Sequence, residues 1–74
     1  MLEIKPADRV YNFVIDKIKT SIWTPDTKIM SENELALELN VSRVSVREAY
    51  EKLSALGLIV KRRGSGTFIN KEIA

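Results

Sequence analysis

The hydrophobic residues near the start of the chain recur at steps of three and four. This spacing gives a helix one continuous apolar face, and it predicts a helix from about Pro6 to Ile22. Pro6 suits the first turn of that helix, because a helix leaves its first N–H groups without partners. The residues of the apolar face are Val10, Phe13, Val14, Ile18 and Ile22.

The helical period breaks at residues 23–30. Thr24-Pro25-Asp26 is typical of a turn, since proline fixes φ and an aspartate side chain can bond its own backbone. Lys28-Ile29-Met30 is compatible with a short strand. Trp23 is predicted to pack beneath the turn as a core residue rather than to bind a ligand.

A second, short helix is predicted after this turn. Ser31-Glu32-Asn33-Glu34 has the pattern of a capping box, in which the serine and the second glutamate each bond a free N–H group of the other. Leu35, Ala36 and Leu39 form its inward face. Asn40 favours the left-handed conformation that ends a helix.

A third helix follows almost at once, capped by Ser42 and running to Leu56. Its predicted buried arc consists of Val46, Ala49, Tyr50, Leu53 and Leu56. Gly57 suits the end of the helix because glycine tolerates a positive φ.

The remaining residues predict a hairpin. Leu58–Arg62 and Thr67–Asn70 favour strands, and Arg63-Gly64-Ser65-Gly66 joins them as a basic glycine loop. Lys71–Ala74 carries no pattern and looks like the start of a linker or a frayed end. The predicted fold is therefore mainly α with a small β-hairpin, a winged helix-turn-helix of three helices plus a two-stranded wing.

Composition limits the chemistry of this chain. Its 74 residues allow one domain, with 45% hydrophobic and 30% charged residues. It has no cysteine and no histidine, so disulfides, thiolate chemistry and the commonest metal ligands are excluded. We expect no cofactor, no metal and no enzymatic activity, because no nucleophile, base or metal site is recognisable. Nothing resembles a signal peptide or a membrane span, so the default location is the cytoplasm.

The charge is unevenly distributed. Residues 1–40 hold five Lys or Arg and seven Asp or Glu, whereas residues 41–74 hold seven and three, which gives net charges of −2 and +4. Three bases are consecutive, Lys61, Arg62 and Arg63. A basic half of this kind indicates a polyanionic partner, although a solvated charged surface is the alternative when charge is the only clue.

The third helix has the features of a helix that reads the major groove of DNA. Arg43 and Arg47 lie one turn apart beside the buried arc, and arginine matches guanine O6 and N7. Ser42 and Ser45 can bond phosphates or base edges. The exposed Val44 is either an ordinary surface valine or a contact to a thymine methyl group.

The predicted wing extends this interface. Lys61 and Arg62 are expected to contact phosphates, and Arg63 to follow the negative potential of the minor groove. Gly64 and Gly66, with Ser65 between them, allow a close approach to that groove, or they simply make the turn.

Four segments, in order and at matching spacing, resemble the GntR family of bacterial transcription regulators. They are Ser31–Ala36, Ser42–Ala49, Leu53–Ile59 and Arg63–Phe68, and the similarity extends from about Arg9 to Asn70. The resemblance implies an operator-binding N-terminal domain joined to a C-terminal domain that binds a small-molecule effector and forms a homodimer on a pseudo-palindromic site. The chain is then expected to be a fragment that lacks the effector domain.

The resemblance also assigns roles to individual positions. It implies that Arg43 and Arg47 read guanines, that Ser45 contacts DNA and that the wing glycines approach the minor groove. Ser31 and Asn33 are further candidate contacts at the start of the second helix, where the family usually has arginine in place of Asn33. Two other departures, Asp26 after Pro25 and Ile29-Met30 in place of Leu-Pro, concern the turn.

Two alternatives to DNA binding remain. A winged helix can also serve as a protein-interaction or dimerisation module, in which case Arg43 and Arg47 should pair with Glu48 or Glu51. The uncompensated bases of the wing argue against this alternative. RNA binding is less favoured, because no strand carries aromatic residues suited to base stacking.

Overall fold

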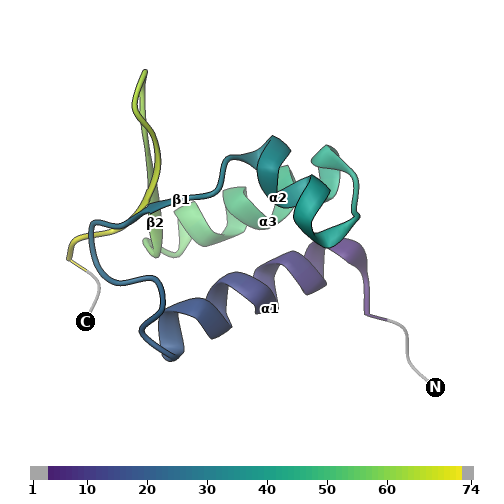
Figure 1. Ribbon diagram of the computed structural model, residues 1–74, viewed down its shortest axis with the longest axis horizontal. Helices are drawn as coiled ribbons and strands as arrows, with labels where there is room; N and C mark the ends of the chain where they lie inside the picture. Colours follow the sequence, from purple (N-terminus) through teal and green to yellow (C-terminus); the bar gives the residue numbers. More distant parts are fainter. Residues whose placement is uncertain (1–3, 73–74) are drawn as a thin grey trace.

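Three helices pack together, and a β-hairpin stands away from them at one edge (Figure 1). The computed structural model describes residues 4–72. Its elements, in chain order, are α1 (Pro6–Lys19), β1 (Lys28–Ile29), α2 (Glu32–Leu39), α3 (Arg43–Ala55), β2 (Ile59–Arg62) and β3 (Gly66–Ile69). The winged helix-turn-helix predicted from the sequence is confirmed. Among residues 4–72, none of the helices combines the length and the apolar character that a membrane span requires.

The sheet has three strands rather than the two predicted for the wing. Its order is β1-β3-β2 and both pairings are antiparallel. Lys28 in β1 lies opposite Phe68 in β3, and Ile29 lies opposite Thr67. Because β1 comes just before α2, this pairing ties the wing to the start of the helix-turn-helix.

One hydrophobic core joins all three helices to the sheet. The largest fully buried side chains are Leu35, Leu53, Ile59, Ile69, Val10, Val14 and Val46. Burying one such side chain contributes about 1.5–3 kcal/mol of favourable transfer free energy. The hydroxyl of buried Tyr50 donates to the carbonyl oxygen of Met30 at 2.7 Å, which fixes α3 to the segment before α2. The core therefore sets the position of the wing relative to α2 and α3.

The predicted caps of α2 are confirmed. The Ser31 N–H donates to Glu34 Oε1 at 2.9 Å, and the Glu34 N–H donates to Ser31 Oγ at 3.1 Å, which completes the capping box. Asn40 ends the helix in the left-handed conformation, with φ of 54°. Trp23 is half-buried and meets the ring of Phe13 edge-on at 5.8 Å, which agrees with its predicted packing role.

The predicted end of the first helix is wrong. The helix ends at Lys19, because the chain turns there: the Thr20 hydroxyl donates to the carbonyl of Asp16 at 2.8 Å, and Ser21 has φ of 60°. Ile22 therefore leaves the apolar face on which the sequence placed it and is 60% exposed.

Leu56 is the second wrong prediction, since it is 56% exposed and not part of the buried arc. Gly57, with φ of +77°, reverses the chain directly after it. The Gly57 N–H then donates to Ser54 and the Leu58 N–H to Leu53, which is the Schellman pattern. Half-buried Leu58 covers the core in place of Leu56. Of the predicted linker residues, 71 and 72 form a turn and 73–74 lie outside the described residues.

Candidate nucleic-acid interface

A groove of about 750 Å³ lies between the start of α2, the exposed side of α3 and the wing. Two carboxylates line it, those of Glu32 and Glu34, together with six cations: Lys28, Arg43, Arg47, Lys61, Arg62 and Arg63. The formal charge of the groove is therefore +4, whereas the whole chain has +2 and the remainder of the sequence must carry −2. The groove is where a polyanion would bind.

The structure brings ten of the thirteen predicted DNA-binding residues to this groove. They are Ser31, Asn33, Arg43, Arg47, Lys61, Arg62, Arg63, Gly64, Ser65 and Gly66. The other three, Ser42, Val44 and Ser45, occupy the N-cap and first turn of α3 and do not line the groove. Val44 is 63% exposed, as predicted, while Ser45 is half-buried.

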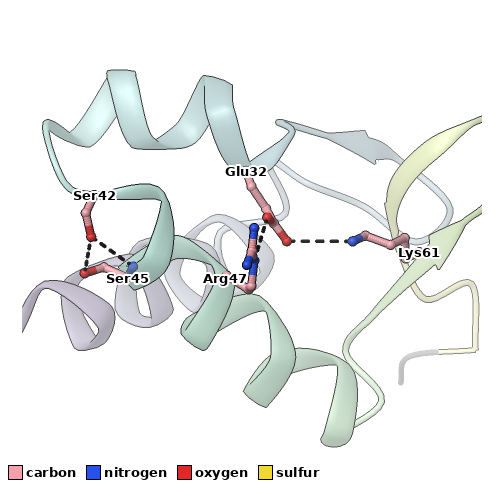
Figure 2. A network of polar contacts seen from close by, with 5 residues as sticks. All are labelled: Glu32, Ser42, Ser45, Arg47 and Lys61. Atoms are coloured by element: carbon pink, nitrogen blue, oxygen red, sulfur yellow. Dashed lines mark hydrogen bonds and ion pairs between the residues drawn. The ribbon is translucent and has the colours of Figure 1, made fainter.

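The start of α3 is held by a serine pair. The Ser45 N–H donates to Ser42 Oγ at 3.1 Å, and the two hydroxyl oxygens lie 3.0 Å apart (Figure 2). This cap leaves the N–H groups of Arg43 and Val44 without a partner among the described residues. Free N–H groups at a helix start attract anions, so this turn is suited to a phosphate oxygen.

Glu32 connects the two halves of the groove. Its carboxylate lies 3.5 Å from Arg47 Nε and 3.7 Å from Lys61 Nζ, so that it joins α3 to the wing (Figure 2). Its side chain is 21% exposed, whereas those of Arg47 and Lys61 are 62% and 72% exposed. Sequence reasoning treated Glu32 only as part of the capping motif, because nothing in the local pattern places it beside residues 15 and 29 positions away.

The ion pairs of Glu32 and Asp26 change one conclusion drawn from the sequence, on the bases of the wing, and bear on a second, on the pairing of Arg47. The bases of the wing are not uncompensated, since Lys61 pairs with Glu32 and Arg62 with Asp26. Arg47 pairs with Glu32 of another helix rather than with Glu51 one turn along α3. The intrahelical pairing expected for a docking module is therefore not formed by Arg47.

Arg62 is restrained on the outer side of the wing. The guanidinium of Arg62 donates a hydrogen bond to the Asp26 carboxylate and lies over the ring of Phe68, with Cζ 4.2 Å from the ring centroid. Arg63, at the tip, is exposed and forms no ion pair with any described carboxylate. The wing thus carries one restrained arginine and one available arginine.

The two wing glycines have different surroundings. Gly64 has φ of +77° and open space around the position of a Cβ atom, so its conformation alone accounts for glycine there. Gly66 has φ of +124°, and a Cβ atom on it would meet Lys28 Cε at 2.8 Å. Gly66 therefore also makes room for a side chain from β1.

Two titratable groups beside the groove are perturbed. The hydrogen bond from the backbone of Ser31 lowers the pKa of Glu34, so this carboxylate stays charged and capped. Burial raises the pKa of Tyr50, and the carboxylates of Glu32 and Glu34 add to the effect. Tyr50 is therefore a hydrogen-bond donor that supports the fold.

Comparison with known proteins gives a consistent result at the level of sequence. The family model described as bacterial regulatory proteins, gntR family, matches residues 6–69. The histidine utilization repressor of Pseudomonas putida is 39% identical over 61 residues, which are 82% of this chain and 25% of that protein. The arabinose metabolism transcriptional repressor of Halalkalibacterium halodurans is 47% identical over 62 residues, 78% of this chain and 16% of that protein.

Solved structures agree with the sequence matches. The DNA-binding domain of AraR in complex with operator ORR3 superposes with a TM-score of 0.87 at 32% identity, covering 92% of this chain and 82% of that one. A GntR family transcriptional regulator from Listeria monocytogenes has a TM-score of 0.90 at 23% identity, covering 95% and 61%, and shows the shared fold. These relatives are named as regulators, which agrees with the expectation that the chain is not an enzyme.

Proposed function

Because the chain belongs to the gntR family of bacterial regulatory proteins, we propose that it binds double-stranded DNA sequence-specifically to regulate transcription. The observation that carries this proposal is the groove, which gathers Arg43, Arg47 and the three bases of the wing on one surface. The operator complex of AraR, a structure with the same fold, supports DNA as the partner.

In this proposal α3 enters the major groove. One side of the helix is fixed in the core by Val46, Tyr50 and Leu53, so the opposite side is free to approach DNA. Arg43 and Arg47 contact guanines from that side, each through the planar fork that matches O6 and N7. Val44, which is exposed beside them, contacts a thymine methyl group or remains a surface residue.

The start of the interface is set by serines and backbone groups. Ser42 and the free N–H groups of the first turn of α3 bind a phosphate, which fixes the helix in register without reading sequence. Ser31 and Asn33 are placed on the adjoining edge of the groove and act in the same way. Ser45, half-buried, supports the cap and contacts DNA from the same turn.

The wing lies at the neighbouring minor groove. Arg63 is directed there by the negative potential of the groove, and Gly64-Ser65-Gly66 permits a close approach of the backbone. Lys61 contacts phosphate after exchanging Glu32 for the DNA backbone. Arg62 contacts phosphate only if it gives up Asp26, so we assign it a weaker role than Lys61.

The chain spans about a quarter or less of the curated relatives it matches, 25% of the Pseudomonas repressor and 16% of the Halalkalibacterium repressor. We therefore propose that it serves as the N-terminal DNA-binding domain of a larger cytoplasmic protein. In that protein, two copies form a homodimer on a pseudo-palindromic operator, and a C-terminal domain binds a small-molecule effector. An isolated domain then binds weakly, because it lacks the avidity of the dimer.

The experiment is a fluorescence-anisotropy titration with duplex DNA of random sequence at several salt concentrations. The proposal predicts that the wild-type chain binds and that its affinity falls steeply with salt, as expected when phosphates release counterions. Arg47→Ala should weaken binding by about 1–3 kcal/mol at a preferred site. Absence of binding by the wild type at low salt and high concentration would overturn the proposal and favour a protein-docking module.

A further inference from the structure

Lys28 is a cation of the groove that the predicted DNA interface does not include. It lies in β1, opposite Phe68 of β3 in the antiparallel register. Its side chain is exposed, and it forms no ion pair with any described carboxylate. No local pattern selects Lys28, because its position depends on the pairing of β1 with a strand that follows about 40 residues later.

The register divides the sheet into two faces. Residues directly opposite in antiparallel strands, and residues two apart in one strand, have side chains on the same face. Lys28, Phe68 and Arg62 therefore share the outer face, where Arg62 lies over the Phe68 ring. Lys61 and buried Thr67 share the inner face, where Lys61 meets Glu32.

We propose that Lys28 is a further contact to the DNA backbone, on the opposite face of the wing from Lys61. The inference rests on the proposed function. A minor groove has a phosphate backbone along each side and is about 6 Å wide, so a wing placed in it has one face toward each backbone. Lys61 then binds phosphate on the side of α3, and Lys28 binds phosphate on the far side.

The charges around Lys28 support this assignment. On the outer face of the wing, Arg62 is already paired with Asp26. Lys28 is therefore the cation on this face that is available for a new anion. Glu34 lies near enough to sense Lys28, but its carboxylate is engaged by the N–H of Ser31. A phosphate would therefore not have to displace an existing partner from Lys28.

Gly66 gives the lysine its position. The site of a Cβ atom on Gly66 lies 2.8 Å from Lys28 Cε and 3.6 Å from Nζ, so the end of the lysine side chain crosses directly over this glycine. A Cβ atom at position 66 would oblige the end of this side chain to shift. Gly66 thus leaves room for Lys28 over the wing, whereas the position of a Cβ atom on Gly64 lies in open space.

The test measures the salt dependence of binding with Lys28→Met, which keeps a long apolar side chain over Gly66 but removes the charge. Each phosphate contact contributes about 0.9 to the slope of log K against log salt, so Lys28→Met should reduce the magnitude of the slope by about 0.9. The matched control is Lys19→Met, which removes the same charge from the exposed end of α1 outside the groove and should leave the slope unchanged. Equal slopes for the two variants would overturn the inference.

A wild-type chain that shows no salt-dependent binding refutes the proposed function, and the Lys28 contact with it. A wild type that binds, with Lys28→Met behaving as Lys19→Met, refutes the Lys28 contact alone.

Discussion

Glu32→Gln removes the carboxylate that joins α3 to the wing and leaves a side chain of nearly the same shape. In the free protein that carboxylate lies 3.5 Å from Arg47 Nε and 3.7 Å from Lys61 Nζ. Both cations are expected to bind DNA, so each must exchange Glu32 for DNA when the complex forms. In the variant no ion pair with residue 32 has to be broken when DNA binds, and the groove carries one negative charge less.

The magnitude follows from the exposure of the two cations. Since 62% of the Arg47 side chain and 72% of the Lys61 side chain are exposed, water screens both pairs, and each contributes about 0.2–1 kcal/mol. The variant should therefore lose no more than about 2 kcal/mol of unfolding free energy. Its affinity for DNA of random sequence should rise by about 0.4–2 kcal/mol, which is roughly 2- to 30-fold.

The assay is anisotropy with random-sequence duplex and, separately, with a selected binding site. We expect affinity to rise for both duplexes, because Arg47 and Lys61 give up Glu32 in either complex. Glu38→Gln is the control, since it removes the same charge from an exposed position of α2 that does not line the groove. Weaker binding of Glu32→Gln to random DNA, or the same gain in Glu38→Gln, would refute the reasoning.

Three further predictions concern stability. Tyr50→Phe should lower the unfolding free energy in urea by about 0.5–1.5 kcal/mol through loss of one buried hydrogen bond, and an unchanged value would show that the bond is not formed. Leu35→Ala, fully buried, should cost about 2–5 kcal/mol, whereas Leu37→Ala, 85% exposed, should change stability by less than about 0.5 kcal/mol. Because folding lowers the pKa of Glu34, the stability that its carboxylate contributes is present above the ordinary pKa of 4.5 and is lost as pH falls through the folded pKa. Glu34→Gln should therefore flatten the acid side of a plot of unfolding free energy against pH. An unchanged plot would contradict the hydrogen bond from the Ser31 N–H to Glu34.

Local signals were sufficient for the helices and for most of the interface. The capping box at Ser31, the serine cap of α3 and the left-handed Asn40 each involve atoms within a few residues, so sequence spacing determines them. The positions of Arg43 and Arg47 beside a buried arc follow from helical periodicity alone, and both line the groove. The same periodicity wrongly included Ile22 and Leu56 in the predicted apolar faces. The turns that end these two helices depend on the backbone conformation of Ser21 and Gly57, which hydrophobic spacing does not indicate.

The contacts between segments far apart in the chain could not be predicted from the sequence. The pairing of β1 with β3 brings Lys28 to the wing, and the packing of α2 on α3 brings Glu32 to Arg47. Each depends on the tertiary arrangement of elements, and no local pattern specifies it. For the same reason Arg62 looked available in the sequence, although Asp26, 36 residues earlier, binds it in the structure.

Base reading by α3 can be tested with one set of titrations. A preferred site is selected from a random pool, and each of its guanines is then replaced one at a time; wild type and Arg47→Ala are titrated against every duplex. If Arg47 reads a guanine, Arg47→Ala loses about 1–3 kcal/mol on the intact site and almost nothing on the duplex in which that guanine is already replaced. An equal loss on every duplex would show that Arg47 reads none of these guanines, and would contradict its proposed role in the major groove.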